Sequence, residues 1–564
     1  MNWKDLRYIV EQLAEALDHV PHDEARILAL LDTLCASGDA RALVPLLAVL
    51  WPCAELHSSR SILGKPHAQF RSRDLKISPT LRYATGTRLM DFLARFPTFR
   101  LREIDHAIRR AGRDHWAALL RGTGWTIWLK PPEPDALWAE PSRTAQLCLL
   151  ACHANGHVRE AAIVALRGDK TGMALPFIML RTMDWVEPVA RRAMAACELI
   201  IARTPEHLVE SLPLISNLQP SIRPPAQWLY THIGEVLTGE SQRELLLSAL
   251  RHADRRVARV AAIFATVLEG DALEACVSAA MLSRDATLRR IALRWEARLR
   301  PTAPEFAAGL RAHFLQDKAA PLRAEALRLH VTLEGDSGVL KHALLDPAPI
   351  VRDTARFYLR KLMTAEEFAS FYRAAASTAK SSAVIAAALC GVGELGGQAD
   401  TKLLRGFLGA TPRIAKAAMR GLVRLDPAAA RGLLLNLLAD RRAGVQRQAL
   451  RLLDARLTNA DAAILRGHLV NDDMADRRPL ALAMLRLPIW ENLSCLLDLA
   501  LNDPSAADAA LHQWRAEARP NYAPPKLDKV DGDRLQGSLS AVANKLDEHV
   551  AGYIGRELAL WTQD

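Results

Sequence analysis

Residues 346–355 read DPAPIVRDTA, and this short stretch contains the pattern that determines the fold. Val351 and Ala355 are four positions apart, so they lie on one face of a helix. Arg352 directly follows the apolar Val351, and the small side chain of Ala355 lets a neighbouring helix approach closely. Asp346 stands five residues before Val351, where we expect the helix N-cap. The stretch therefore predicts an amphipathic helix that begins at a turn and packs against another helix.

The same pattern recurs along the chain: an apolar anchor residue, one or two basic residues, and an Ala four positions after the anchor. The Ala positions are Ala162, Ala193, Ala226, Ala261, Ala292, Ala326, Ala355, Ala387, Ala418, Ala449, Ala481 and Ala510. Successive positions are 29 to 35 residues apart, which predicts about twelve copies of one unit. Stretches with Leu at helical spacing, such as 244–250 and 428–438, lie between these helices. Each unit is therefore predicted to be a helix, a turn and a second helix, and the units must stack because none can bury its apolar face alone.

Several Asp residues stand five positions before an anchor and predict the starts of second helices. They are Asp184, Asp317, Asp346, Asp440 and Asp472. Three units depart from the pattern, because the anchor position holds Ala383 in one and Arg477 in another, and Pro224-Pro225 interrupt a third. We expect those units to be distorted or misaligned with the pattern.

The form Asp-x-x-x-x-Val-Arg-x-x-Ala resembles the second helix of HEAT repeats, especially the short bacterial HEAT-like type first named from phycobilisome lyases. The resemblance covers residues 155–519. It implies an all-α fold, a right-handed α-solenoid of about twelve helix-turn-helix HEAT-like repeats. In HEAT-like solenoids the second helix of each pair lines the concave side, so the resemblance places the second helices of this chain there.

Residues 1–154 are predicted to be helical but off-pattern, and they form an N-terminal cap region. The expected helices are 5–17, 24–34 and 42–50. Residues 58–82 are polar and rich in basic residues, which predicts a basic surface loop. Residues 116–138 contain Trp116, Trp125, Trp128 and Trp138. We interpret this Trp-rich segment as a local core, because Trp side chains bury a large apolar area.

The carboxy-terminal end also leaves the repeat pattern. Residues 520–536 contain Pro520, Pro524 and Pro525 among mixed charges, which predicts a linker. Residues 537–564 are predicted to be a C-terminal helix. Terminal units of a solenoid need a polar outer face, so we interpret both ends as caps.

Cysteine usage and hydropathy bear on the compartment. The chain has eight Cys and no CxxC, so we predict a reducing environment without a disulfide framework. Its first residues are charged where a signal peptide needs an apolar core. The longest apolar stretch, 42–54, contains two prolines and is too short to span a bilayer. The sequence predicts a cytoplasmic protein with no membrane partner.

No arrangement of residues in the sequence predicts catalysis, so we expect no enzyme activity and no cofactor. The cluster Cys148, Cys152, His153 and His157 has some features of a zinc site, but its spacing favours small Cys side chains packed within a helix, and no metal is predicted. Some HEAT-like enzymes carry di-iron sites built from His-Glu pairs, and the sequence has no His-Glu dipeptide. No Gly-x-Ser-x-Gly motif and no Gly-rich phosphate loop appear.

The remaining candidate site is a basic surface. The formal net charge is +10 and the pI about 9.3, with Arg as the main basic residue. The second helices are the most basic segments: residues 284–300 hold six Arg against two acidic residues, and residues 440–456 hold five against two. Guanidinium groups form forked contacts with carboxylates and phosphates, so such a surface fits an acidic partner.

Arginines in the second helices have two interpretations. Those next to an anchor can bond to an Asp of the adjacent unit and form an internal ladder, and the candidates are Arg159, Arg289, Arg323 and Arg352. Those later in the helix are better candidates for outward, concave-face contacts: Arg294, Arg298, Arg356, Arg360, Arg420, Arg424, Arg451 and Arg456.

The sequence therefore predicts a non-enzymatic scaffold that binds a protein partner with an acidic surface through an Arg-rich concave face. The alternative is a nucleic-acid-binding solenoid, because a row of Arg also fits phosphates. A third hypothesis is a HEAT-like DNA glycosylase that uses Trp228, Trp295 and nearby acidic residues, although nothing in their spacing selects them.

Overall fold

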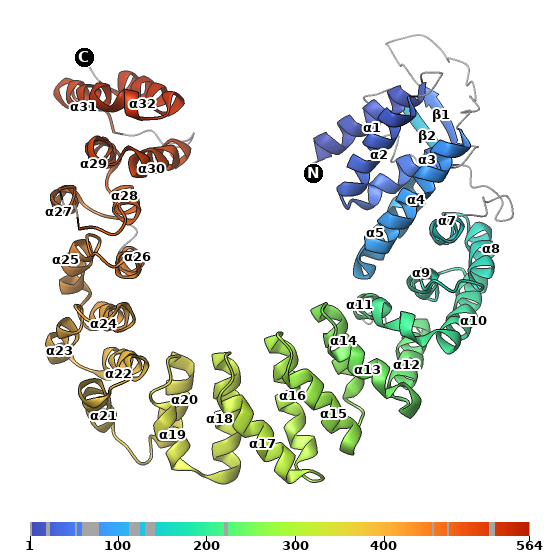
Figure 1. Cartoon of the computed structure of the whole chain (residues 1–564), viewed down its shortest axis with the longest axis horizontal. Helices are drawn as coiled ribbons and strands as arrows, with labels where there is room; N and C mark the ends of the chain where they lie inside the picture. The colour runs from blue at the N-terminus through green and yellow to red at the C-terminus, as the bar shows by residue number, and fades with distance from the viewer. Residues whose placement is uncertain are drawn as a thin grey trace. The chain divides into compact units, whose positions relative to one another are not determined.

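The computed structural model of the chain describes residues 3–18, 23–50, 54–58, 78–111, 125–129, 142–218, 224–453, 456–470, 473–517 and 525–562. The chain, shown in Figure 1, divides into two compact units, which we call the amino-terminal unit (Met1–Leu310) and the carboxy-terminal unit (Arg311–Asp564). The division falls within helix α17 (Pro304–Leu315), inside the region that the sequence predicts to be one run of repeats.

Across the described residues, α7 to α30 form twelve helix pairs. The first helices of the pairs are α7 (Arg143–Leu150), α9 (Ala174–Arg181), α11 (Leu208–Leu218), α13 (Arg243–Leu250), α15 (Gly270–Met281), α17, α19 (Ser337–Ala343), α21 (Ala365–Thr378), α23 (Thr401–Gly406), α25 (Pro427–Leu437), α27 (Asn459–Gly467) and α29 (Ile489–Asn502). The second helices are α8 (Gly156–Leu166), α10 (Glu187–Arg203), α12 (Pro224–Thr238), α14 (Arg255–Ala265), α16 (Ala286–Leu299), α18 (Ala320–Glu334), α20 (Pro349–Leu359), α22 (Ser382–Leu395), α24 (Pro412–Leu425), α26 (Ala443–Leu452), α28 (Arg478–Met484) and α30 (Pro504–Glu517). Short 3₁₀ turns precede some of these helices: η4 (Pro205–His207), η5 (Glu240–Gln242) and η6 (Gln398–Asp400).

The predicted Ala register is confirmed. Each of the twelve Ala residues lies in a different second helix, from Ala162 in α8 to Ala510 in α30, and all twelve are buried. The first pair begins at Arg143 and so includes α7, ahead of the start at residue 155 given by the pattern. The all-α class is confirmed for the described part of the chain, apart from one small sheet in the cap.

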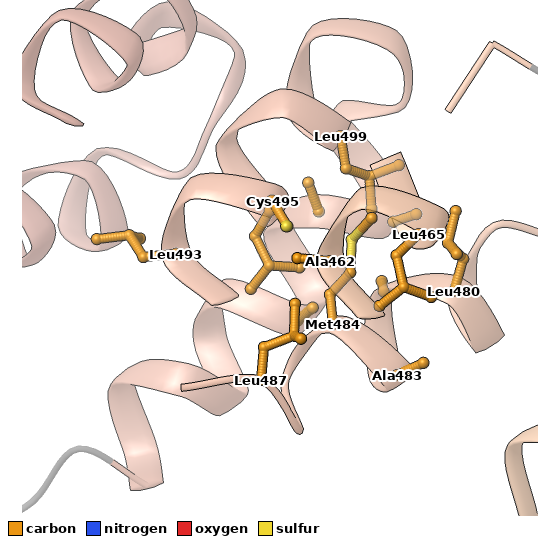
Figure 2. Close-up of a cluster of buried hydrophobic side chains, with 14 of the residues drawn as sticks. Ala462, Leu465, Leu480, Ala483, Met484, Leu487, Leu493, Cys495 and Leu499 are labelled. Carbon is orange, nitrogen blue, oxygen red and sulfur yellow. The ribbon is translucent and has the colours of Figure 1, made fainter. Parts of the chain in front are cut away.

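The helix pairs are arranged in two layers. In Figure 1 the second helices α22, α24, α26, α28 and α30 lie side by side in one layer, and their first helices form the other. Figure 2 shows the core between the layers at α27 to α29, where Leu465, Leu480, Met484 and Leu499 point toward one another. Leu, Ala and Met supply most of this core, so the stack is held by apolar packing between neighbouring pairs.

The turns within the pairs contain a recurrent hydrogen bond that corrects the predicted N-caps. In seven units the side chain five residues before the anchor accepts the backbone N–H of the N-cap residue, which comes two positions later. These side chains are His153, Asp184, His252, Ser283, Asp317, Asp346 and Asp440. Asp184, for example, accepts the N–H of the N-cap residue Val186 at 3.0 Å. The predicted caps Asp184, Asp317, Asp346 and Asp440 therefore precede the N-cap by two residues and form Asx turns, and Asp472 lies outside the described residues.

Two of the irregular units differ from expectation. Pro224 and Pro225 do not interrupt a helix, because α12 begins at Pro224 and proline is well tolerated in a first turn. Arg477 is not an anchor inside a helix but the N-cap residue of the short helix α28. The neighbouring Asp476 accepts the N–H of Arg478 at 2.9 Å, so the turn lies later in the sequence than the pattern predicts.

The cap contains the expected helices and one unexpected sheet. The helices are α1 (Trp3–Asp18), α2 (Glu24–Ala36), η1 (Ala40–Ala42), α3 (Leu43–Leu50), α4 (Pro79–Arg95), η2 (Thr98–Arg100) and α5 (Leu101–Ala111). Strand β1 (Ala54–Ser58) pairs antiparallel with β2 (Trp125–Leu129), with Ala54 opposite Leu129. Trp125 and Trp128 lie in β2, whereas Trp116 and Trp138 lie outside the described residues.

The predicted basic loop and carboxy-terminal linker are both shorter than expected. Ser78 caps α4 by accepting the N–H of Leu81 at 3.0 Å, so residues 78–82 are not loop, and residues 59–77 lie outside the described residues. At the other end, α31 (Lys529–Val542), η7 (Ala543–Lys545) and α32 (Glu548–Trp561) replace the single predicted helix. The predicted helix is divided at Asp547. The carboxylate of this residue accepts the N–H groups of His549 and Val550 and caps the start of α32.

A close approach between two second helices gives a first prediction. A Cβ atom on Gly393 of α22 would lie 2.4 Å from the Cα of Gly421 in α24, and backbone cannot move aside as a side chain can. Gly393→Ala is therefore expected to destabilise the carboxy-terminal unit by about 1–3 kcal/mol, as overpacked cores do. Urea denaturation followed by circular dichroism measures the change.

The matched control is Gly432→Ala in α25, where an added Cβ meets no atom within 4 Å. This variant is expected to be neutral or to stabilise by up to about 1 kcal/mol, because alanine is the better helix former. Equal unfolding midpoints for the two variants would contradict the close approach.

Candidate binding surfaces

The internal ladder consists of hydrogen bonds from arginines near the anchors to Asp residues of the next pair. Arg159 donates to Asp184 at 2.8 Å, and Arg323 donates to Asp346 at 2.7 Å, in each case to the turn of the next pair. Arg259 does the same with Asp285 at 2.6 Å. These bonds join the second helix of one pair to the following turn, so they support the stack.

The other two predicted ladder arginines are also held inside the protein. Arg289 donates to the backbone carbonyls of Ser283 and Arg284 in its own turn, at 2.9 and 3.2 Å. Arg352 bonds to the carboxylate of Glu394 in α22, which takes the place of a turn Asp, and to the carbonyl of Asp346 at 2.7 Å. Both side chains are buried.

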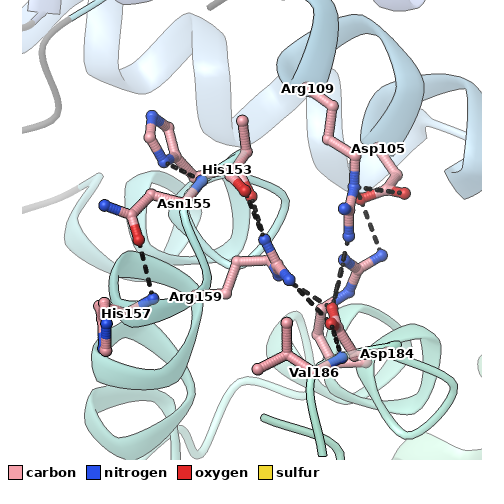
Figure 3. Close-up of polar contacts among 10 residues, drawn as sticks. Asp105, Arg109, His153, Asn155, His157, Arg159, Asp184 and Val186 are labelled. Atoms are coloured by element: carbon pink, nitrogen blue, oxygen red, sulfur yellow. Dashed lines mark hydrogen bonds and ion pairs between the residues drawn. The ribbon is translucent and has the colours of Figure 1, made fainter.

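Figure 3 shows a network of polar contacts in the amino-terminal unit. The guanidinium of buried Arg159 lies between the carbonyls of its own turn and the carboxylate of Asp184. Asp184 also contacts Arg181 at 3.1 Å and Arg109 at 3.4 Å, and both of these arginines contact Asp105 of α5. Burial alone would raise the pKa of Asp184, but the bond from Arg159 and the nearby charges outweigh burial and lower it. The network therefore keeps Asp184 ionised and fastens the cap to the first two helix pairs.

The Cys and His residues beside this network are placed as packing residues. Cys148 and Cys152 are buried, and burial raises the pKa of Cys152 to about 12, so its thiol stays protonated at neutral pH. His153 accepts the N–H of Asn155 through Nδ1 at 3.0 Å, and burial lowers the pKa of its imidazole. No group of three or more His, Cys, Asp or Glu side chains within the described residues is arranged to hold a metal ion.

Among the arginines predicted to point outward, Arg298 and Arg356 are occupied inside the protein. Arg298 of α16 donates to the carbonyls of Thr266 and Leu268, the latter at 2.8 Å, and these carbonyls directly follow the end of α14. Arg356 of α20 donates to Glu394 at 2.9 Å and to the Tyr372 hydroxyl at 3.2 Å. Sequence alone did not predict these bonds, because the acceptors lie far along the chain.

The other six predicted arginines keep an exposed side chain. Arg294 lies on α16 of the amino-terminal unit, and Arg360 of α20 has its guanidinium carbon 3.9 Å from the centre of the Phe357 ring. The remaining four are brought together by two neighbouring second helices of the carboxy-terminal unit. They are Arg420 and Arg424 of α24, Arg451 of α26, and Arg456 just beyond α26.

Three further basic residues extend this surface, and we call the whole set the basic face. It consists of Arg413, Lys416, Arg420 and Arg424 of α24, Arg447 and Arg451 of α26, and Arg456. Neither helix contains an acidic residue. The helices pack against each other, and a Cβ on Gly444 of α26 would lie 3.0 Å from the Lys416 ammonium. The basic residues of the two helices therefore form one surface.

The basic face differs from the ladder because most of its donors have no carboxylate partner among the described residues. Arg420 and Arg447 donate only within their own helices, to the carbonyls of Lys416 and Ala443, both at 3.3 Å. Arg424 is the exception, since it contacts Glu394 at 3.4 Å while most of its side chain stays exposed. Such guanidinium groups are available for forked contacts with carboxylate or phosphate.

Sequence reasoning missed Arg413, Lys416 and Arg447, although a signal for them was present. In residues 412–425 the basic positions are three or four apart and fall on one side of the helix. The aromatic residues of the glycosylase hypothesis are placed differently: Trp295 is buried, and the Trp228 ring stacks on His232 at 5.4 Å between centroids. Trp295 therefore has no exposed face on which a base could stack.

Membrane insertion of the described helices is not indicated, because none of them combines the length and apolar character of a transmembrane span. No protein-family model matches the sequence, and no curated protein matches it.

Several solved structures of helical-repeat proteins are similar to this chain at low identity. The karyopherin Kap121p bound to the extreme C-terminus of the protein phosphatase Cdc14p is 10% identical, with 96% of this chain and 71% of that chain covered and a TM-score of 0.27. Kap121p bound to Nup53p is 11% identical, with 96% and 58% covered and a TM-score of 0.28. The S. pombe condensin Cnd3–Cnd2 subcomplex is 11% identical, with 99% and 100% covered and a TM-score of 0.25. At TM-scores this low, the likenesses carry no argument for a shared function.

Proposed function

We propose that this chain is a non-enzymatic HEAT-like scaffold that binds an acidic segment of a protein partner over the basic face of α24 and α26. The observation that carries the proposal is the concentration of basic side chains on two adjacent helices without an acidic residue. Elsewhere the stack uses arginine to hold itself together, as Arg159 and Arg323 do. A surface of exposed donors, most of which have no carboxylate partner among the described residues, fits recognition better than support.

The remaining predicted residues have different weights in this proposal. Arg420, Arg424, Arg451 and Arg456 belong to the basic face and are proposed to contact the partner. Arg294 and Arg360 are exposed but lie on other helices, so we give them a secondary role. Arg298 and Arg356 are proposed to act through the fold, because their donors already bond to internal acceptors.

The test compares two charge-reversal variants of the full chain as bait in lysates of cells that express it. Arg420→Glu with Arg451→Glu reverses the basic face, and Lys402→Glu with Arg405→Glu makes the same charge change at exposed positions of the adjacent first helix α23. Like-charge contacts cost several kcal/mol at an interface, so the first variant is expected to bind its partner at least about tenfold more weakly. The second variant is expected to bind as the wild type does.

Quantitative mass spectrometry of the retained proteins, with and without nuclease, measures the difference. A partner retained equally by the wild type and by the variant with the reversed basic face would contradict the proposal. Circular dichroism spectra should coincide for all three proteins, because the substituted side chains are exposed.

Nucleic acid is the second candidate ligand, and the absence of acidic residues in α24 and α26 favours it. A polyanion pairs with such a face without repulsion, and binding then weakens steeply with salt, by about 0.9 log units per phosphate contact for each tenfold rise in salt for a DNA duplex. Loss of the captured material after nuclease treatment would favour this candidate over a protein partner.

A further inference from the structure

We propose that an open cleft between two consecutive turns of the amino-terminal unit binds a phosphorylated side chain of a peptide segment. The cleft has a volume of about 770 Å³, within the range of roughly 300–1,000 Å³ that is typical of ligand pockets. It lies between the turn of the α13–α14 pair and the turn of the α15–α16 pair, and we call it the turn cleft. This site shares no residue with the basic face, so the inference goes beyond the proposed function.

Small side chains create the space. Ala258 of α14, Ala279 of α15 and Ala286 of α16 line the turn cleft, as does Ala253 in the first turn. Larger side chains at these positions would fill the gap between the two pairs. The cleft therefore depends on the small side chains at these positions.

Three arginines surround the turn cleft. Arg251 and Arg255 come from the first turn and the start of α14, and Arg284 comes from the second turn. All three are exposed, and none of them forms an ion pair or hydrogen bond with a carboxylate of the described residues, although the charge of Arg255 is near enough to help lower the pKa of Asp285. This contrasts with Arg259 and Arg298 nearby, which are occupied by internal bonds. The three guanidinium groups can therefore turn toward a ligand.

The acidic groups of the turn cleft are already neutralised or used as helix caps. Asp285 accepts two bonds from Arg259, at 2.6 and 2.9 Å, and the hydrogen bond from Arg259 outweighs burial and lowers the pKa of Asp285. Asp254 accepts the N–H of Arg256 at 2.8 Å and caps α14. Counting Arg259 with the three arginines, four positive charges accompany the two carboxylates that line the turn cleft, and the Glu210 carboxylate at its border reduces the surplus from two to one.

One further polar contact borders the turn cleft. The His252 Nε2 atom lies 3.1 Å from the carboxylate of Glu210, and His252 Nδ1 accepts the N–H of Asp254. His252 therefore has both ring nitrogens engaged and is not needed for the ligand. The surplus positive charge of the cleft comes from the arginines alone.

The charge and shape of the turn cleft select a phosphate monoester on a peptide. Phosphate carries nearly two negative charges at neutral pH and offers three acceptor oxygens, which match forked donors from more than one arginine. Helices α14 and α16 both begin at the cleft, and the positive ends of their dipoles favour an anion there. Leu282 stands at the rim with 79% of its surface exposed, so an apolar residue beside the phosphorylated one can cover it. Free phosphate would gain nothing from Leu282.

The test measures fluorescence polarisation of short labelled peptides with the full-length chain. Three degenerate peptide mixtures differ only in a fixed central residue, which is phosphoserine, serine or glutamate. The phosphoserine mixture is expected to bind at least about tenfold more tightly than the other two, because two forked contacts add more than the roughly 1.4 kcal/mol that a tenfold change requires. Inorganic phosphate is expected to compete only at much higher concentration than the phosphoserine mixture.

Two variants locate the binding. Arg251→Gln with Arg284→Gln is expected to weaken phosphoserine binding at least about tenfold, whereas Arg243→Gln leaves it unchanged. Arg243 is exposed at the opposite end of α13, and it does not line the turn cleft. The variant with the reversed basic face should keep phosphopeptide binding, which separates this inference from the proposed function. Absence of phosphoserine binding, equal binding of the three mixtures, equal potency of inorganic phosphate, or full binding by the first variant would each overturn the proposal.

Discussion

Asp184→Ala is expected to destabilise the region from α7 to α10 by about 3–5 kcal/mol, the range seen when one partner of a buried ion pair is removed. The side chains of Asp184 and Arg159 are both fully buried. Without the carboxylate, Arg159 keeps its two backbone carbonyl acceptors but loses the negative charge that balances it. Arg181 loses one of its two carboxylates, and the N–H of Val186 loses its acceptor.

Hydrogen exchange of the α8 and α10 amides is the most direct measurement, because a stack of repeats can unfold locally. Protection in these helices is expected to fall, while protection in the carboxy-terminal unit is expected to stay the same. The matched control is Glu187→Ala, which removes the partner of Arg191 from an ion pair whose side chains are about 70% exposed. Exposed pairs contribute little, so this control should leave exchange unchanged. Equal exchange in the two variants would contradict the role assigned to the Asp184 network.

Glu394→Ala is expected to destabilise the region from α20 to α24 to a similar extent, about 3–5 kcal/mol. The Glu394 carboxylate bonds to Arg352 and Arg356 of α20 and contacts Arg424 of α24, so it ties together three consecutive second helices. The Arg352 side chain is only 1% exposed and would be left as a buried charge. Urea denaturation of the full chain measures the loss. Asp353→Ala is the control, because it removes an exposed partner of the same Arg356 guanidinium.

The same residue predicts an acid dependence. Burial raises the pKa of Glu394, but the bonds from Arg352 and Arg356 outweigh it, so the pKa lies below its usual 4.5. A carboxyl with a lowered pKa in the folded protein contributes its full stability above its unfolded pKa and loses it as pH falls through the folded pKa. Unfolding midpoints of the wild type should therefore fall as the pH decreases below about 4.5. The fall should be smaller in Glu394→Ala, and an identical pH profile would contradict the assignment.

Local sequence predicted the repeat because the signal for it is local. An anchor and an Ala four residues later lie on one helix face whatever the rest of the chain does, and Ala355 and its eleven equivalents are buried. The turn position five residues before the anchor was also found. These Asp residues were predicted to be N-caps, but the N-cap lies two residues later, since an Asp such as Asp346 can either cap a helix or accept the N–H of the cap residue.

Features that depend on distant residues could not be predicted in this way. Arg356 has the same spacing and chemistry as the outward-facing arginines, and its bond to Glu394, 38 residues later in the sequence, turns it inward. The pairing of β1 with β2 joins segments separated by α4 and α5, although the aromatic and β-branched residues of 125–129 favour a strand. For the basic face, by contrast, the absence of acidic residues in 412–425 was a usable local signal.

The ladder bonds have a mechanical consequence. Arg159–Asp184, Arg259–Asp285 and Arg323–Asp346 each connect one helix pair to the next, 23 to 26 residues along the chain. A tensile load applied to the two ends therefore passes through a series of short-range links, and none of these links spans several pairs. We expect such a stack to lengthen by separation of one helix pair from the next, because each repeat contacts only its neighbours.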